Sequence, residues 1–144
     1  MVNAASKLTE IGMQLKPDRI INLGTAGSYT VQPGTLVEVA SLIQRGNVVS
    51  FMRQRKNLTT VSELPKVICG TADFVEVEKS PSNLYQIMDM EAMAFAQVSE
   101  TLRVPFHSFK FITDSSDVNT LKDWKRNLAS AQTSFLNFCQ SLNN

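Results

Sequence analysis

Met88-Asp89-Met90-Glu91-Ala92 and Phe109-Lys110-Phe111-Ile112-Thr113-Asp114 are the two stretches that decide the fold of this 144-residue chain. The first places Glu91 at the start of an expected helix, and the second is an apolar strand that ends at Asp114. A third stretch, Asn22 to Gly27, places small residues after a buried strand, which predicts a tight turn. Ligands bind beyond the carboxyl ends of parallel strands, and all three stretches are expected there.

Strands alternate with helices along the chain, which predicts a single α/β domain over residues 1–144, with a mixed, largely parallel sheet flanked by helices. Apolar spacing predicts helices over 3–15, 91–102 and 121–142, and the last of these has apolar residues three and four apart. Buried strands are expected over 19–23, 36–43, 66–69, 84–88 and 105–113, with a long polar loop over 44–64.

The charges are balanced, with 14 Lys and Arg against 13 Asp and Glu and a formal net charge of +1. That balance gives no electrostatic footprint for nucleic acid or an anionic membrane, and the basic run Arg53 to Lys56 is interpreted as a solvated loop. No apolar run approaches a membrane span and the first residues lack a signal-peptide pattern, so a cytoplasmic location is expected. Cys69 and Cys139 are expected to be free thiols, with neither a metal nor a disulfide implied.

Two carboxylic acids on neighbouring segments can break an N-glycosidic bond. A buried acid that is protonated at working pH can donate its proton to the departing base, and Asp114 is the candidate. A carboxylate that accepts hydrogen bonds from the sugar hydroxyls can orient the ring and stabilise its positive charge, and Glu91 is the candidate. Each residue also has a purely structural interpretation, because Asp114 lies in a turn-forming sequence and Glu91 begins a helix.

The order and spacing of these segments resemble the purine nucleoside phosphorylase and nucleosidase superfamily, and most closely the 5′-methylthioadenosine/S-adenosylhomocysteine nucleosidases. The resemblance implies hydrolysis of a purine nucleoside with release of adenine, no metal or organic cofactor, and a homodimer. The matching stretches extend over nearly the whole chain: Val2–Ala5, Lys16–Asp18, Ile20–Gly27, Gly70 with Asp73–Val75, Asp89–Ala92, Val104–Phe106 and Lys110–Asp114.

The resemblance also implies a role for each matched residue. Asp114 would protonate the purine at N7, and Glu91 would bind the ribose hydroxyls. Phe74 would stack on the base, and the backbone of Val75 would recognise its edge. Thr25, Ala26 and Gly27 would lie near the sugar and nucleophile, Met90 against the sugar, and Thr113 beside the acid. Lys110 stands where many relatives carry arginine, and Trp124 where relatives place an aromatic over the base. Asp89 is also implied in the pocket, and its role stays open.

Departures from the family pattern keep other functions open. Bacterial-type phosphorylases carry an arginine where this chain has Asn22, so water is the expected nucleophile and a phosphorylase is the alternative. Family members also begin with further strands that carry a glycine-rich turn and a water-positioning glutamate. The matching here starts at Val2, so the fold is expected to be shortened at its N-terminus. A catalytically impaired nucleoside-binding or interaction module is therefore a second alternative. The segment Gln44 to Asn47 also departs from the acidic or histidine-containing pattern of relatives.

Overall fold

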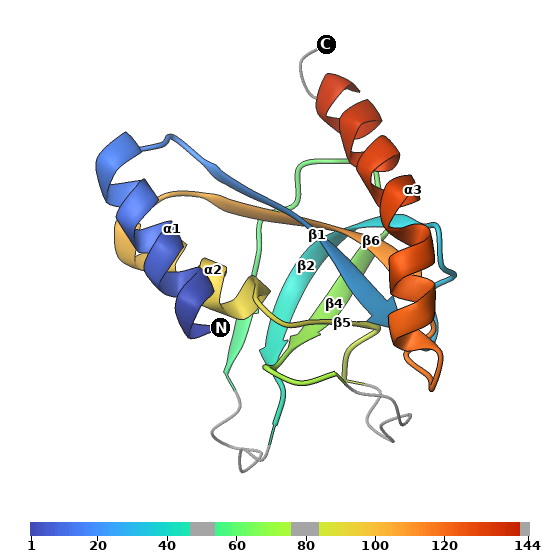
Figure 1. Ribbon diagram of the computed structural model, residues 1–144. Coiled ribbons are helices and arrows are strands. Elements are labelled where there is room, and N and C mark those ends of the chain that lie inside the picture. The colour runs from blue at the N-terminus through green and yellow to red at the C-terminus, as the bar shows by residue number, and fades with distance from the viewer. Residues whose placement is uncertain (47–53, 76–83, 142–144) are drawn as a thin grey trace.

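The computed structural model describes residues 1–46, 54–75 and 84–141 (Figure 1). Within these ranges the chain forms an α/β fold, as the sequence predicts. The helices are α1 (Val2–Leu15), α2 (Ala92–Leu102) and α3 (Thr120–Ser141), and the strands are β1 (Ile20–Ser28), β2 (Leu36–Gln44), β3 (Arg55–Asn57), β4 (Lys66–Thr71), β5 (Ile87–Asp89) and β6 (Phe106–Asp114).

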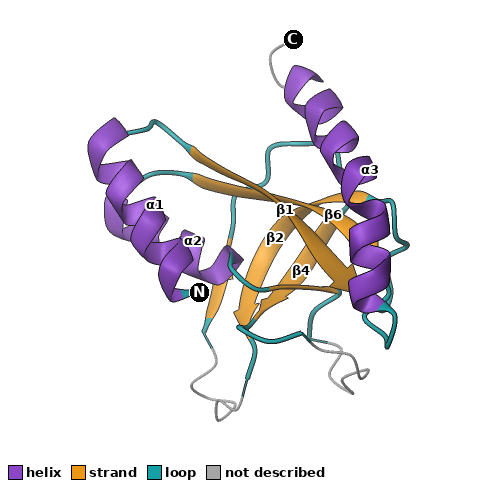
Figure 2. Ribbon diagram, in the orientation of Figure 1, coloured by secondary structure: helices purple, strands orange, loops and turns teal. Residues whose placement is uncertain are grey.

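The strands form one mixed sheet in the order β3-β2-β4-β5-β1-β6, and β2 also pairs with β6 (Figure 2). This last pairing closes β2, β4, β5, β1 and β6 into a ring. One edge of β2 serves both neighbours, because Leu36–Glu38 pairs with β6 and Ser41–Ile43 pairs with β3. The sheet is mixed, as the sequence predicts. Strands β2, β4 and β5 run parallel to one another, as do β1 and β6, and antiparallel pairings join β5 to β1, β2 to β6 and β2 to β3.

Helices α1 and α2 pack together on one side of the ring, and α3 lies against β6 and β1 on the other (Figure 1). Helix α1 ends at Leu15, as the sequence predicts, and its C-cap residue Lys16 takes a left-handed conformation (φ 46°) just before Pro17. Its apolar face is only partly covered, since Ile11 is 38% and Leu15 72% exposed.

The core fills the ring and the space under α2. Its buried members are Ala26, Val37, Val39, Leu42, Val67, Cys69, Ile87, Ala92, Met93, Ala96, Phe106 and Ile112. Helix α3 packs through the C-terminal half of its predicted apolar stripe, where the Phe138 ring lies tilted against the Phe109 ring with centroids 4.5 Å apart. The N-terminal half packs less, since Leu121 is 68% exposed, and Leu142 lies outside the described residues.

Two local predictions need correction. The polar stretch 44–64 contains strand β3, so Arg55 and Lys56 belong to a strand that pairs with β2 rather than to a solvated loop, while 47–53 lies outside the described residues. The strand expected over 84–88 is shorter and later, since β5 begins at Ile87. Both cysteines are free, as expected. None of the described helices is long and apolar enough to cross a bilayer.

Candidate active site

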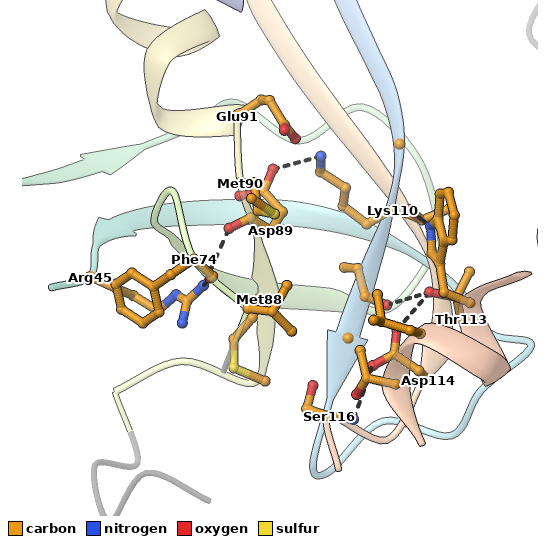
Figure 3. A pocket seen from close by; sticks show the side chains of 18 of the residues that line it. Arg45, Phe74, Met88, Asp89, Met90, Glu91, Lys110, Thr113, Asp114 and Ser116 are labelled. Atoms are coloured by element: carbon orange, nitrogen blue, oxygen red, sulfur yellow. Dashed lines mark hydrogen bonds and ion pairs between the residues drawn. The ribbon is translucent and has the colours of Figure 1, made fainter. Parts of the chain in front are cut away.

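A cavity of about 630 Å³ lies between β1, the β5–α2 junction, the end of β6 and the first turns of α3 (Figure 3). Glu91 and Asp114 come from different elements and both line it. The structure brings every residue singled out in the sequence to this one cavity: Thr25, Ala26, Gly27, Phe74, Val75, Asp89, Met90, Glu91, Lys110, Thr113, Asp114 and Trp124.

The small residues Gly24 to Gly27 are not a turn, because they continue β1 as far as Ser28. Glycine is needed there for a different reason. A Cβ atom at Gly24 would lie 2.9 Å from the Lys110 ammonium nitrogen, and one at Gly27 would lie 2.7 Å from Oδ1 of Asp114. Two side chains of β6 therefore pass over β1 at positions that have no side chain of their own.

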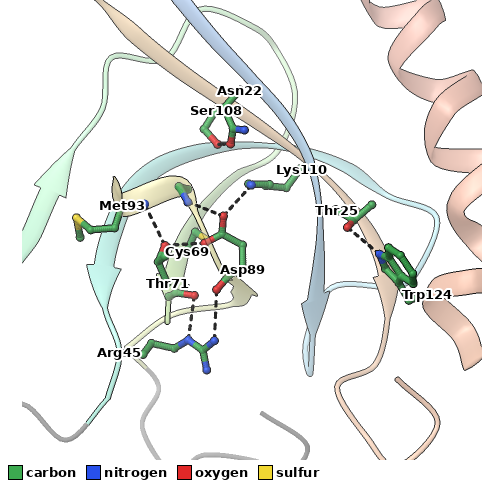
Figure 4. Close-up of polar contacts among 12 residues, drawn as sticks. Asn22, Thr25, Arg45, Cys69, Thr71, Asp89, Met93, Ser108, Lys110 and Trp124 are labelled. Atoms are coloured by element: carbon green, nitrogen blue, oxygen red, sulfur yellow. Dashed lines mark hydrogen bonds and ion pairs between the residues drawn. The ribbon is translucent and has the colours of Figure 1, made fainter. Parts of the chain in front are cut away.

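Lys110 and Asp89 form a buried ion pair of 2.7 Å in the cavity wall (Figure 4). Asp89 also accepts hydrogen bonds from the Thr71 hydroxyl at 2.6 Å and from the Ala92 N–H at 2.9 Å. Burial raises the pKa of Asp89, but the Lys110 ammonium and these donors outweigh it and hold the pKa below its usual 3.8. Asp89, whose role the sequence left open, therefore neutralises Lys110 and accepts a hydrogen bond from the first turn of α2.

The same pair keeps Lys110 charged. Burial lowers the pKa of Lys110, but the Asp89 carboxylate more than offsets this effect and the pKa lies above 10.5. Glu91 stands beside the pair at the N-terminus of α2, and Figure 3 shows its carboxylate pointing toward the ammonium group. Burial and the charge on Asp89 raise the pKa of Glu91 above 4.5. Glu91 is half-buried and remains accessible from the cavity.

Asp114 is the last residue of β6 and is 3% exposed. A register shift between β1 and β6 places Gly27 opposite Asp114 although Ala26 lies opposite Ile112, so Thr113 is an extra residue in the strand. Such a bulge changes the direction of the side chain that follows it.

The Asp114 carboxylate accepts hydrogen bonds on both oxygens. Oδ1 accepts from the Ser116 N–H at 3.0 Å and from the Thr120 hydroxyl at 3.1 Å, and Oδ2 accepts from the Thr113 hydroxyl at 2.9 Å. The turn interpretation of Asp114 is therefore confirmed, since the carboxylate organises the β6–α3 connection, and the same carboxylate lines the cavity.

The opposite end of the cavity is built around Arg45, which the sequence did not identify as a pocket residue. Its guanidinium is buried, donates to the carbonyl oxygens of Gly70 at 3.0 Å and Asp89 at 3.4 Å, and lies 5.0 Å from the centre of the Phe74 ring. The feature of the sequence that could have identified Arg45 is its position directly after an apolar strand. Phe74 and Val75 are each 48% exposed and present apolar surface there.

Trp124 closes the α3 side of the cavity. Its indole N–H donates to the Thr25 hydroxyl at 3.1 Å, and the side chain is 37% exposed. Thr120 and Leu121, from the turn before it, also line the cavity and were missed in the sequence, because Thr120 falls outside the apolar stripe of α3.

This closed ring with a cavity at one end has the nucleoside phosphorylase-like α/β fold, which recurs in solved nucleosidases. Helicobacter pylori 5′-methylthioadenosine/S-adenosylhomocysteine nucleosidase matches with a TM-score of 0.83 and 16% identity over 97% of this chain and 74% of that one. The futalosine hydrolase of the same organism matches with a TM-score of 0.79 and 17% identity, over 92% and 71% of the two chains. Arabidopsis thaliana 5′-methylthioadenosine nucleosidase matches with a TM-score of 0.74 and 22% identity, over 93% and 67%.

At these identities the likeness establishes the fold. A nucleosidase of Chlamydia trachomatis is covered over 66% of its length, so this chain spans only 66% to 74% of the lengths of these structures. No protein-family model matches the chain, and no curated protein sequence matches it. An aspartate-to-asparagine mutant of the Helicobacter pylori enzyme carries 5′-methylthioadenosine in its active site, so solved relatives of this fold bind purine nucleosides.

Proposed function

We propose that this chain binds a purine nucleoside such as 5′-methylthioadenosine or S-adenosylhomocysteine and hydrolyses its N-glycosidic bond, releasing adenine. The observation that carries the proposal is that Glu91 and Asp114 line one cavity from different elements, with Phe74 and Val75 at the same cavity. A cavity of about 630 Å³ lies within the range of small-molecule sites.

In the proposed reaction the Glu91 carboxylate accepts hydrogen bonds from the ribose hydroxyls and stabilises the positive charge that grows on the sugar. Phe74 stacks on the base. As the bond between C1′ and N9 breaks, its electron pair moves into the base and Asp114 donates a proton to N7. Water then adds to C1′ and loses a proton, which returns to the Asp114 carboxylate through solvent. Neither step requires a metal or an organic cofactor.

The charges of the cavity favour water over phosphate as the nucleophile. Its described cations are Lys110, which is paired with Asp89, and Arg45, which donates to backbone carbonyls. Three acids line the same cavity, and with Asp114 protonated as the proposed acid, Asp89 and Glu91 balance the two cations, so the cavity has no excess positive charge to hold an anion. Asn22 is neutral and its side-chain oxygen accepts a hydrogen bond from the Ser108 hydroxyl at 3.0 Å.

The test is incubation of the purified chain with 5′-methylthioadenosine while adenine is followed by chromatography, with and without phosphate. The proposal predicts phosphate-independent adenine release that is lost in Asp114→Asn. No adenine above the Asp114→Asn background would overturn it. Phosphate-dependent formation of a ribose 1-phosphate would instead identify a phosphorylase.

A nucleoside-binding module without turnover is the second candidate. The observation that favours it is on β1, which pairs with β5 only through Gly27 and Ser28, so that Ile20–Ala26 has β6 as its one strand neighbour among the described residues. Calorimetric titration with adenine and with 5′-methylthioadenosine separates the candidates, since binding without turnover supports the module.

Two expectations from the sequence stay predictions. Assembly as a homodimer is part of the proposed function and is tested by light scattering of the purified chain. The cytoplasmic location is tested by fractionation of the source cells.

A further inference from the structure

Helix α3 has a second face, made of hydrogen-bond donors, in addition to its apolar stripe. Thr120, Trp124 and Asn127 are spaced four and three residues apart, so they lie on one side of the helix. Each donates a hydrogen bond to a different point at the rim of the cavity. Thr120 donates to Oδ1 of Asp114 at 3.1 Å, Trp124 donates to the Thr25 hydroxyl at 3.1 Å, and Asn127 donates to the Thr113 carbonyl at 2.7 Å.

Two of these contacts constrain the proposed acid, one at its backbone and one at its carboxylate. Asn127 fixes the backbone immediately before Asp114, and Thr120 fixes one oxygen of its carboxylate. Thr120 is 9% exposed, and Asp114 and Thr113 are almost fully buried, so solvent has little access to replace these contacts. The carboxylate belongs to the last residue of β6 that pairs with β1, just after the bulge, so no further strand pair beyond it holds its direction.

The contacts also distinguish the two carboxylate oxygens. Oδ1 receives two donors, from the Ser116 N–H and the Thr120 hydroxyl, so a proton placed there would displace one of them. Oδ2 faces only the Thr113 hydroxyl among the described contacts, and that hydroxyl can turn its hydrogen toward the Ala26 carbonyl at 3.4 Å instead. The transferable proton is therefore best accommodated on Oδ2.

We propose that Thr120 and Asn127 are positioning residues that hold Asp114 in the orientation needed to reach N7 of a bound purine with Oδ2. The inference rests on the proposed function for the identity of the ligand. It goes beyond that function by assigning the orientation of the acid to α3, an element that contributes no acid of its own to the cavity.

The experiment compares Thr120→Val with Thr120→Ser, because valine keeps the shape and removes the donor while serine keeps the donor. Thr133→Val is the matched control, since Thr133 lies on the same helix, is exposed and bonds only the Ala129 carbonyl among the described contacts. A misdirected acid is expected to lower kcat about 10- to 100-fold in Thr120→Val with KM within about twofold of the parent. Thr120→Ser should restore most of the rate, and Thr133→Val should not change it.

A second measurement does not depend on turnover. The protein's only tryptophan, Trp124, lines the cavity, so binding of adenine and of 7-deazaadenine, which lacks N7, can be followed by its fluorescence. The parent should bind adenine about tenfold more tightly than 7-deazaadenine, which is the effect of one hydrogen bond to a buried acid. Thr120→Val and Asn127→Leu should abolish that preference and leave the affinity for 7-deazaadenine unchanged.

The outcomes separate the proposed hydrolase activity from the proposed positioning role of Thr120 and Asn127. An inactive parent that still prefers adenine, with the preference lost in Thr120→Val, overturns the hydrolase and supports the positioning role. Thr120→Val that keeps both rate and preference, or that loses affinity for both bases equally, overturns the positioning role. A parent that shows no preference for adenine over 7-deazaadenine also overturns it, since no contact to N7 then exists.

Discussion

Lys110 reaches across β1 at Gly24 to place its ammonium nitrogen 2.7 Å from the Asp89 carboxylate, and both side chains are at most 2% exposed. The pair ties β6 to the β5–α2 junction, so it joins the two walls of the cavity that carry Asp114 and Glu91. Its energetic value is context-dependent, because two buried charges are stable mainly through each other.

Replacing Lys110 by methionine should leave Asp89 charged, buried and without its cation. The free energy of unfolding should fall by about 3–5 kcal/mol in urea titrations. The double variant Asp89→Asn/Lys110→Met should recover much of that loss, because asparagine is neutral and can still accept from the Ala92 N–H. Lys56→Met is the control at the more exposed pair with Glu100, where the loss should stay below about 1 kcal/mol. Equal losses of unfolding free energy in Lys110→Met and Lys56→Met would show that the buried pair contributes no more to stability than the exposed pair.

Nucleoside binding should weaken in mild acid through Glu91. Burial and the charge on Asp89 raise the pKa of Glu91 above 4.5, so as pH falls the carboxylate is protonated earlier than an ordinary glutamate. The dissociation constant of 5′-methylthioadenosine, followed by Trp124 fluorescence, should therefore rise from about pH 7 to pH 5 more steeply than that of adenine, which has no ribose. In Glu91→Gln this difference between the two ligands should disappear, and its persistence would place the titrating group elsewhere.

The same shift has a consequence for stability without ligand. A raised pKa means that Glu91 contributes stability below 4.5 and loses it as pH rises through the folded-state pKa. Glu91→Gln should therefore unfold no more readily than the parent at neutral pH. A large loss of stability in this variant would point to a structural rather than a binding role.

Replacing Gly27 by alanine should lower the rate of adenine release more than it lowers the stability of the fold. The new Cβ would lie 2.7 Å from Oδ1 of Asp114 and would also collide with Oγ of Ser116. Overpacking of this kind costs about 1–3 kcal/mol of stability, while adenine release should fall about 100-fold because the carboxylate is displaced. Adding Ser116→Gly should restore part of the rate, since it removes one collision at a residue whose φ of 52° suits glycine. No recovery in the double variant would show that the Ser116 collision is not what displaces the acid.

Arg45 should control affinity for the base. Its guanidinium joins the carbonyls of Gly70 and Asp89 and lies against the Phe74 ring, a planar geometry that lysine cannot reproduce. Arg45→Lys and Arg45→Leu should both weaken adenine binding about tenfold, as measured by calorimetry. Arg55→Leu, at a more exposed arginine of β3 outside the cavity, should bind like the parent. If Arg45→Lys binds like the parent, charge rather than shape supports the base end.

The sequence predicts the helices and most strands of this fold because their apolar patterns are local. Helix α1 ends at Leu15, as expected, and β6 ends at Asp114, one residue beyond the expected strand. The closure of the ring was not predictable, because the pairing of β2 with β6 joins Leu36 to Phe111 and leaves no local pattern. The antiparallel pairing of β5 with β1 leaves no local pattern either, because it joins Met88 to Gly27 and Ile87 to Ser28.

The cavity residues divide in a similar way. The acids Glu91 and Asp114 stand at the ends of elements, where a polar residue after an apolar run is visible in the sequence. The sequence predicts a turn at Gly24 and Gly27, because only the structure shows that side chains of β6 cross β1 there. Thr71 is not predictable, since its hydrogen bond to Asp89 spans 18 residues and a threonine near the end of a strand carries no distinctive signal.

Because of the bulge at Thr113, the position of the Asp114 carboxylate depends on β6 having one residue more than the matching span of β1. From Ile20 to Gly27, β1 has eight residues, and they are matched by the nine residues from Phe106 to Asp114 of β6. A deletion of Thr113 would make the two counts equal and remove the bulge, together with the hydroxyl that donates to Oδ2 of the acid and the carbonyl that Asn127 holds. Single-residue insertions and deletions in these two strands are therefore more hazardous for this protein than most substitutions in them.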